Sequence, residues 1–345
     1  MENCRTQGNS AGDGGGAYLM NSSCIQNSLF SGNSATNNGG GVYVPEGTSL
    51  MGCVVSGNQA AVDGGGVYLT HSGTTYNSLI VQNQAGGKGG AIFANQGSKI
   101  FSNTIVDNQA PQGAGIWVDE GASILNSVVW GNDSTGIEFP ESYFYHVQYS
   151  CADGGVTNGA SGCITNEPCF TDPANGDYTL RSHSPCINGG TNDNVQTATD
   201  LAGYLRIMDG TVDMGAYEYL TPGSDPDGDG IPDNWEVRYF DSVMDCVSNA
   251  CSDSDALNNW QEYIAGTDPT DGSSYFCITN CSVETDGYLI EWNPVSGRSY
   301  SIWAADSLTN SFTLLTNNLA YPVSSCAVEI DTTNRFFKLE VELED

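Results

Sequence analysis

The chain has few cations for its length. Its 345 residues include nine Lys plus Arg against 41 Asp plus Glu, which gives a formal net charge of −32. Nucleic acids and anionic membranes are bound through clustered cations, so this balance argues against both as partners and favours cations as ligands. The sequence also has no long apolar run, so no membrane insertion by a transmembrane helix is expected.

Two further features bear on where the chain acts. The first residues show no signal peptide, because Met1 is followed at once by Glu2 and a first repeat begins at Cys4. Twelve cysteines, in contrast, exceed ordinary cytosolic usage and indicate an oxidising compartment with disulfides. We expect a secreted or cell-surface protein whose sequence is a mature or truncated part of a longer exported chain. An intact start is the alternative.

Helical periodicity is lacking too, since the apolar runs are short and separated by Gly, Asn and Ser. A short repeat takes its place. One phrase recurs at intervals of 25, 25, 25 and 24 residues, at Gly14–Leu19, Gly39–Val44, Gly64–Leu69, Gly89–Ala94 and Gly113–Val118. A second phrase ends, at the same period, in Asn9, Asn33, Asn58, Asn83, Asn108 and Asn132. Two interleaved repeats of this kind predict a right-handed parallel β-helix over residues 1–148, with the asparagines hydrogen-bonded from rung to rung.

Aligned positions separate the inside of this β-helix from the outside. Side chains two residues apart on a strand share a face. Two apolar columns are therefore predicted to point inward, Ala17, Val42, Val67, Ile92 and Ile116, and Leu19, Val44, Leu69, Ala94 and Val118. The residues between them form an outward aromatic stripe, Tyr18, Tyr43, Tyr68, Phe93 and Trp117. The stripe could bind a sugar or a protein, or its rings could stack on one another or lie under another part of the chain.

After residue 148 the repeat gives way to a loop-rich segment, 149–220, which is expected to form irregular final rungs and a cap. It contains the phrases Asn166–Leu180, Ser184–Gly190, Asp200–Arg206 and Val212–Tyr219. In these phrases the chain resembles bacterial surface proteins of the choice-of-anchor Q family, which are related to right-handed β-helix repeats of the polymorphic outer-membrane type. The resemblance implies an exported bacterial surface protein, and it supplies no catalytic motif.

The strongest chemical signal is an acidic loop within residues 221–272, Asp225-Pro-Asp-Gly-Asp-Gly-Ile-Pro-Asp-Asn-Trp-Glu236. Its oxygen-bearing residues, its glycine at the sixth position and its spacing match a calcium loop. The predicted ligands are Asp225, Asp227, Asp229, the carbonyl of Ile231, Asp233 and Glu236. The loop resembles the calcium repeats of thrombospondin type 3 and dockerin.

A second loop, Cys251–Glu262, is a poorer copy of the first. Asp253, Asp255 and Glu262 stand at matching positions, but Cys251 replaces the first carboxylate. This replacement argues against an independent site, and it leaves open a site shared with the first loop or with Asp268. The candidate disulfides of the chain are Cys151–Cys163, Cys169–Cys186 and Cys246–Cys251.

The remaining residues, 273–345, alternate as short strands and turns, which predicts a C-terminal antiparallel β-sandwich. The expected fold class is therefore all-β, with a parallel β-helix, a small calcium-binding module and this sandwich. Calcium is the one cofactor that the sequence predicts.

Catalysis is not expected from the rungs. Polysaccharide cleavage needs paired carboxylates, or a carboxylate cluster with a Lys or Arg base on one face. The rungs have only Arg5, Lys88 and Lys99 as cations, and the histidines are scattered. We expect a non-catalytic surface protein with a structural and adhesive role, stabilised by calcium. One version assembles head to tail into a fibre through the strand edges of its first rung. The other is a monomeric adhesin for a glycan or a protein, and a polysaccharide lyase or hydrolase is the less favoured alternative.

Overall fold

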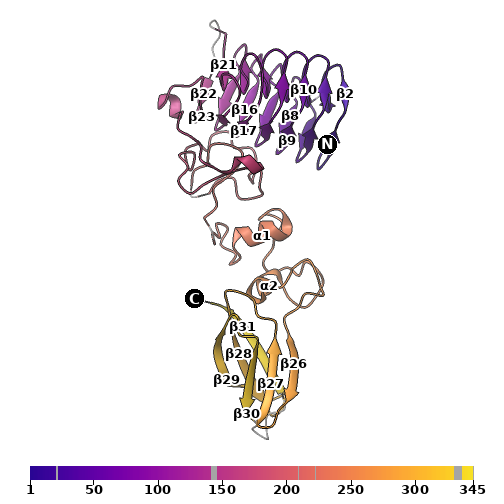
Figure 1. The fold of residues 1–345 in the computed structure, drawn as a ribbon, viewed down its shortest axis with the longest axis vertical. Helices are drawn as coiled ribbons and strands as arrows, with labels where there is room; N and C mark the ends of the chain where they lie inside the picture. The colour runs from indigo at the N-terminus through magenta and orange to yellow at the C-terminus, as the bar shows by residue number, and fades with distance from the viewer. Residues whose placement is uncertain (21, 141–145, 209, 222, 330–335, 345) are drawn as a thin grey trace. The chain divides into compact units, whose positions relative to one another are not determined.

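The computed structural model describes residues 1–20, 22–140, 146–208, 210–221, 223–329 and 336–344, which form two compact units, 1–226 and 227–345 (Figure 1). The first unit is a parallel β-solenoid of about six turns followed by a loop-rich segment. The second unit contains two short helices and two small antiparallel sheets. Among the described residues, no helix has the length and apolar character that crossing a membrane requires.

Each turn of the solenoid contributes short strands that pair in register with their equivalents in the next turn, and the strands build four parallel sheets. Sheet 1 contains β1 (Arg5–Gln7), β5 (Leu29–Ser31), β9 (Val54–Ser56), β13 (Leu79–Val81), β17 (Thr104–Val106), β20 (Val128–Trp130) and β23 (Cys151–Ala152). Sheet 2 contains β2 (Ser10–Ala11), β6 (Ser34–Ala35), β10 (Gln59–Ala60) and β14 (Gln84–Ala85). Sheet 3 contains β3 (Ala17–Tyr18), β7 (Val42–Val44), β11 (Val67–Leu69), β15 (Ile92–Ala94), β18 (Ile116–Val118) and β21 (Ile137–Glu138). Sheet 4 contains β4 (Cys24–Gln26), β8 (Ser49–Met51), β12 (Thr74–Tyr76), β16 (Lys99–Phe101), β19 (Ser123–Leu125) and β22 (His146–Gln148).

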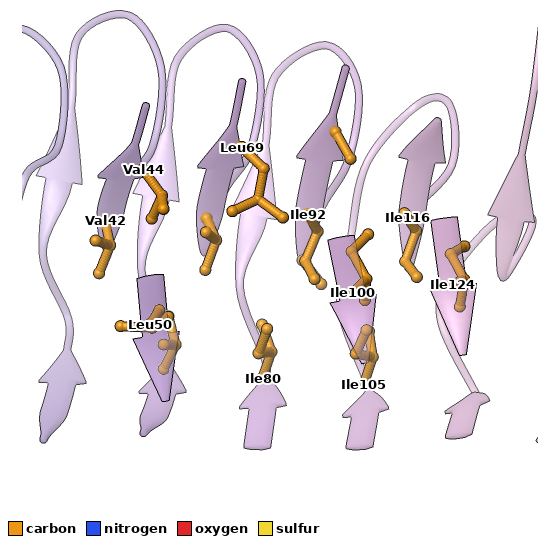
Figure 2. Packing of buried hydrophobic residues seen from close by; sticks show 14 of the residues in the cluster. Val42, Val44, Leu50, Leu69, Ile80, Ile92, Ile100, Ile105, Ile116 and Ile124 are labelled. Carbon is orange, nitrogen blue, oxygen red and sulfur yellow. The ribbon is translucent and has the colours of Figure 1, made fainter. Parts of the chain in front are cut away.

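The predicted inward columns form the core of the solenoid. Val42, Val67, Ile92 and Ile116 pair in register along sheet 3, and each is fully buried. Figure 2 shows Val42, Ile92 and Ile116 of this column on the same side as the buried residues of the other sheets, such as Leu50 and Ile80. Because each rung adds equivalent apolar side chains to one continuous stack, the repeat itself builds the core.

The glycines of the first phrase are required by the geometry of the turn into sheet 3. Gly64 has a φ of +66°, which side chains rarely adopt. A Cβ on Gly65 would lie 2.4 Å from the carbonyl oxygen of Gly90 in the next rung. The first glycine therefore supplies a left-handed conformation and the second permits the close approach of successive rungs.

The asparagines of the second phrase form the predicted ladder. Each side-chain oxygen accepts hydrogen bonds from the backbone N–H and the side-chain Nδ2 of the preceding asparagine, as between Asn58 and Asn83, where both distances are 2.9 Å. The Nδ2 of Asn83 also donates to the carbonyls of Val55 and Val81 at 2.9 and 3.1 Å. Asn83 is fully buried, so the ladder satisfies backbone groups at a turn that water does not reach.

Replacing Asn83 by alanine is expected to lower the free energy of unfolding of the first unit by about 2–4 kcal/mol, because it leaves buried donors and acceptors without partners. Asn9 is the matched control: it stands at the exposed end of the ladder, and its side chain donates to Asn33. Asn9→Ala should cost less than about 1 kcal/mol. Urea denaturation of both variants measures the difference. Equal losses of unfolding free energy would contradict a larger contribution from the buried part of the ladder.

A loop-rich segment after residue 152 completes the first unit, and it differs from the cap that the sequence predicts. Ile164 adds one parallel bridge to Cys151 at the end of the solenoid. The hairpin of β24 (Phe170–Asp172) and β25 (Asp177–Leu180), however, packs on the outer face of sheet 1 together with residues up to Met214. The segment also contains two short 3-10 helices, Ala160–Gly162 and Pro173–Asn175.

The outer face of sheet 1 explains this position. Leu79, Val81, Val106 and Val128 point away from the solenoid interior, and all four are buried against Phe170, Tyr178, Leu180, Cys186 and Met214. A sheet that is apolar on both faces needs a second layer. The segment therefore covers the side of the solenoid and adds only one partial rung at its end.

The second unit begins with α1 (Asp233–Phe240) and α2 (Asn259–Ala265). Asn258 caps α2 in a reciprocal capping box with Gln261. Two three-stranded sheets follow, in the orders β26-β27-β30 and β29-β28-β31. Their strands are β26 (Ile278–Val283), β27 (Gly287–Trp292), β28 (Arg298–Ala305), β29 (Thr313–Ala320), β30 (Ser325–Glu329) and β31 (Phe336–Leu343). The sheets share one core around Ile290, Trp292, Tyr300 and Ile302, as the alternating sequence predicts.

Candidate metal centre

The first acidic loop winds into α1 through successive turns closed by its own carboxylates. Asp227 accepts a hydrogen bond from the N–H of Asp229 at 3.4 Å, and Asp229 accepts one from the N–H of Ile231 at 2.9 Å. The buried side chain of Ile231 anchors the loop, and Pro232 leads into the helix. The unit boundary falls after residue 226, so the predicted ligand Asp225 belongs to the end of the first unit.

Three predicted ligands of the second unit gather beside the first turn of α1. Asp227, Asp233 and Glu236 each offer an oxygen within 4.8 Å of those of the other two. Asp233 and Glu236 are fully buried. Their placement at the N-terminal turn of a helix favours negative charge only weakly, so three carboxylates this close need a further positive charge to remain ionised together.

Glu236 is the most constrained member of this group. Burial, and then the nearby carboxylates of Asp227 and Asp229, raise its pKa to about 8. Neither of its oxygens receives a hydrogen bond from an N–H or O–H group of the described residues, and the thiol of Cys246 lies beside it. A buried carboxylate without such donors is costly unless a cation or a proton neutralises it. The arrangement can therefore hold a metal ion.

The second loop repeats the same local geometry. Asp253 accepts from the N–H of Asp255 at 3.1 Å, and Asp255 accepts from the N–H of Leu257 at 2.5 Å. Glu262 is fully buried, and burial together with Asp253, Asp255 and Asp268 raises its pKa to about 7. The carboxylates of Asp253, Asp255 and Asp268 therefore lie close enough to Glu262 to disfavour its ionised form.

Two residues of the second loop differ from their counterparts in the first. Cys251 takes the place of a carboxylate, and its sulfur lies within 4.8 Å of oxygens of Asp253 and Asp255. Asn259 stands where the first loop has Asp233, and its amide is engaged with the carbonyl of Val247 at 3.0 Å. The second loop thus offers fewer carboxylate ligands than the first.

The cysteines are all free thiols in the described residues. Cys151 and Cys186 are both buried in the core on the outer face of sheet 1, and a hydrogen bond with the thiol of Cys186, then burial, raise the pKa of Cys151. The thiol of Cys163 instead donates to the carbonyl of Val147 at 3.5 Å. The neighbour of Cys151 is therefore Cys186 in this structure, whereas the sequence predicts Cys163 for Cys151 and Cys169 for Cys186. In the second unit, the thiol of Cys246 lies beside Glu236, and that of Cys251 donates to the carbonyl of Asp255 at 3.2 Å.

The aromatic stripe is a stack of rings. The centroid distances are 4.5 Å for Tyr18 and Tyr43, 5.0 Å for Tyr43 and Tyr68, and 4.7 Å for Tyr68 and Phe93. Tyr18 is 49% exposed, whereas Phe93 and Trp117 are only 7% and 6% exposed. The Nζ of Lys88 lies 4.0 Å from the ring centroid of Trp117 and helps to cover it. The rings therefore cover one another's faces, and the outward exposure expected of the stripe fails at its far end.

The loop-rich segment contains a buried cluster of charged side chains that the sequence did not predict. Arg206, which is 1% exposed, forms an ion pair with Glu218 and donates to the carbonyls of Asp213 and Gly215 at 3.3 and 2.7 Å. Asp200 accepts from the N–H of Glu218 at 2.8 Å. Two buried carboxylates, those of Glu218 and Asp200, thus lie close to a single guanidinium. The signal in the sequence is one arginine placed among several acidic residues in an otherwise cation-poor chain.

The first unit is expected to lose stability as the pH rises from about 4 to about 6. Burial raises the pKa of Asp200 to about 6, so the folded state holds this proton more tightly than the unfolded chain does. The resulting stabilisation is present in full below the unfolded pKa and is lost as the pH passes the folded one, a change of roughly 3 kcal/mol. Urea denaturation across this window, followed by hydrogen exchange of first-unit peptides, measures it. A free energy of unfolding that increases with pH would contradict the assignment.

Comparison with known proteins places the repeat in context. The model of the Chlamydia polymorphic membrane protein repeat matches residues 27–45 and 77–95. The two matches lie two turns apart, and each runs from sheet 1 through the asparagine turn to sheet 3, including β5, β6 and β7 in the first case and β13, β14 and β15 in the second. No curated protein matches the chain. The solenoid of the first unit therefore contains polymorphic membrane protein repeats.

Proposed function

We propose that this chain is a non-catalytic, extracellular bacterial surface protein with a structural and adhesive role, and that its second unit binds calcium. The observation that carries the surface role is the match of the polymorphic membrane protein repeat to the part of a solenoid turn that runs from sheet 1 to sheet 3. A stack of rungs held by asparagine ladders gives a stiff body, as a structural role requires. The net charge of −32 attracts cations to the protein surface and opposes contact with nucleic acid.

Calcium is the cation that fits the first acidic loop best. The group of Asp227, Asp233 and Glu236 consists of hard oxygen donors, which suit calcium better than the softer transition metals. Glu236 supplies the supporting observation, because its buried oxygens lack N–H and O–H donors among the described residues. When bound, the ion would supply the positive charge that these carboxylates need to stay ionised together. Asp227, Asp233 and Glu236 would hold it, with Asp229 closing the turn of the loop.

The surface role is tested on intact cells of the source bacterium. An antibody raised against the purified chain should label unbroken cells or their secreted matrix, and labelling that needs cell lysis would overturn the proposal. Purified protein incubated with representative polysaccharides should yield no new reducing ends or unsaturated products. Turnover that survives repurification would replace this proposal by a lyase or hydrolase.

Electron microscopy and light scattering distinguish the two versions of the role. Ordered filaments in calcium would support a self-assembling building block, and their loss in chelator would place the acidic module at or near the contact. Discrete monomers in both conditions would support a monomeric adhesin instead.

A further inference from the structure

A pocket of about 400 Å³ lies on the outer side of the solenoid, in the first unit. One wall is the outer face of β17 and β20, and the other is the loop-rich segment that includes the hairpin of β24 and β25. The polar and aromatic residues that line it are Asp107, Trp130, Glu167, Tyr178, Arg181 and His183. Its volume lies in the range of small-molecule sites, roughly 300–1,000 Å³. Neither the proposed surface role nor the calcium centre makes use of it.

Two polar groups of the pocket are held in place before any ligand arrives. The hydroxyl of Tyr178 donates to a carboxylate oxygen of Asp107 at 2.9 Å, and the buried Tyr178 ring packs edge-on against Phe170. On the opposite side, the Nε and Nη2 of Arg181 donate to the carbonyl of Thr171 at 3.2 and 2.5 Å. The Asp107 carboxylate and the Arg181 guanidinium are therefore held in position by their own hydrogen bonds, which lowers the entropic cost of binding a ligand.

The charges of the pocket nearly cancel. Asp107 and Glu167 supply two carboxylates, and Arg181 and His183 supply a guanidinium and an imidazole. The carboxylates would repel an anionic ligand, and Arg181 would repel a cationic ligand. An apolar ligand would displace the water around all of these groups, and it would offer no hydrogen bonds in place of those that the water made. The ligand best matched to the pocket is neutral and carries several hydroxyl groups, since each hydroxyl can both donate and accept.

The aromatic lining narrows this choice to a sugar ring. Trp130 ends β20 and remains partly exposed in the pocket. The C–H face of a pyranose can pack on an indole while its hydroxyls reach charged groups at the rim. We propose that this pocket binds a short neutral saccharide, with Trp130 as the stacking surface and Asp107 and Arg181 as the hydrogen-bonding groups. The proposal deepens the proposed surface role and rests on it only in taking the ligand to be extracellular.

The aromatic stripe is the competing location, and its geometry is less suitable. Tyr18, Tyr43 and Tyr68 stack at 4.5 and 5.0 Å, so most ring faces are occupied by neighbouring rings. Tyr18→Ala is consequently a matched control, because it removes an exposed aromatic ring outside the pocket.

The experiment titrates the purified full chain with a panel of neutral oligosaccharides built from glucose, galactose, mannose, xylose or N-acetylglucosamine, and with uronic acid oligomers for comparison. Calorimetry should detect at least one neutral member with a Kd on the order of 1 mM or lower. Trp130→Ala and Arg181→Gln should each weaken that binding by about tenfold or more, whereas Trp130→Phe should retain most of it and Tyr18→Ala should leave it unchanged.

Folding of each variant is checked by its urea midpoint, and Arg181→Gln, at an exposed position of the rim, remains as the test if Trp130→Ala unfolds. Absence of binding to every neutral member, preferential binding of the uronic acids, or loss of binding in Tyr18→Ala alone would each overturn the proposal. Because the assay uses purified protein, such a failure leaves the surface role standing, and a failure of cell labelling leaves the pocket standing.

Discussion

Replacing Arg206 by methionine is expected to lower the free energy of unfolding of the first unit by about 3–5 kcal/mol. Its guanidinium is 1% exposed, pairs with Glu218 and donates to two backbone carbonyls. Removing it takes the guanidinium away from two buried carboxylates, those of Glu218 and Asp200. Burial already raises the pKa of Glu218 even with the arginine present, so the penalty for ionised oxygens should grow when the arginine is lost.

The other ion pair of the described residues is the control for this experiment. Lys338 and Glu340 in the second unit lie 2.5 Å apart, with side chains 49% and 38% exposed. Lys338→Met should cost less than about 1 kcal/mol, because exposed pairs gain little over hydration. Urea denaturation with hydrogen exchange assigns each loss to its unit.

A double variant separates the pair from the packing around it. Arg206→Met combined with Glu218→Gln should recover part of the loss, because it removes one of the uncompensated charges. Arg206→Lys should fall between wild type and Arg206→Met, since an ammonium keeps the charge and loses the fork that reaches both carbonyls. A loss below about 1 kcal/mol in Arg206→Met would show that the cluster contributes little.

The repeat made the solenoid predictable because each position is sampled once in every turn. Val42, Val67 and Ile92 are apolar at one position, and the same register brings them together in one column. The asparagine ladder was predictable for the same reason, and the glycines before sheet 3 follow from a φ and a close approach that every turn repeats. A short period thus converts local sequence into long-range contacts.

The loop-rich segment could not be placed in this way, because its contacts have no period. Tyr178 reaches Asp107 across 71 residues, and the N–H of Ala216 donates to Thr104 across 112. The available signal lay in the strands instead. Leu79, Ile80 and Val81 are consecutive apolar residues, and such a run indicates a strand covered on both faces. The run does not say which segment covers the outer face of sheet 1, because that depends on how side chains distant in the sequence fit this face.

The metal loop lay between these two cases. Ligand spacing brought Asp227, Asp233 and Glu236 together because a helix begins at Asp233 and places residues three apart on neighbouring positions. The second loop shares the turns and the buried glutamate, yet Asn259 is engaged with a backbone carbonyl. Spacing alone did not reveal this difference, since an asparagine can serve either as a ligand or as a structural donor.

Calcium at about a thousand times its Kd is expected to raise the free energy of unfolding of the second unit by about 4 kcal/mol. Glu236→Gln should reduce calcium affinity by at least about tenfold, or 1.4 kcal/mol, because it removes a buried negative ligand. In chelator the same variant should be as stable as wild type or more stable, since the raised pKa of Glu236 reports a cost for its ionised form that glutamine does not bear. Titration calorimetry and urea denaturation, each with and without calcium, measure these two effects.

The opposite signs of these effects distinguish a metal ligand from a residue that merely supports the fold. Asp241→Asn is the control, because Asp241 is an exposed acid that ends α1 and its replacement makes the same change in charge. It should alter neither calcium affinity nor stability by more than about 0.5 kcal/mol. If Glu236 only supported the helix, Glu236→Gln would destabilise the unit equally with calcium and with chelator. A ligand must instead stabilise in calcium and cost stability without it, because burial penalises its charge in one state and the ion compensates that charge in the other.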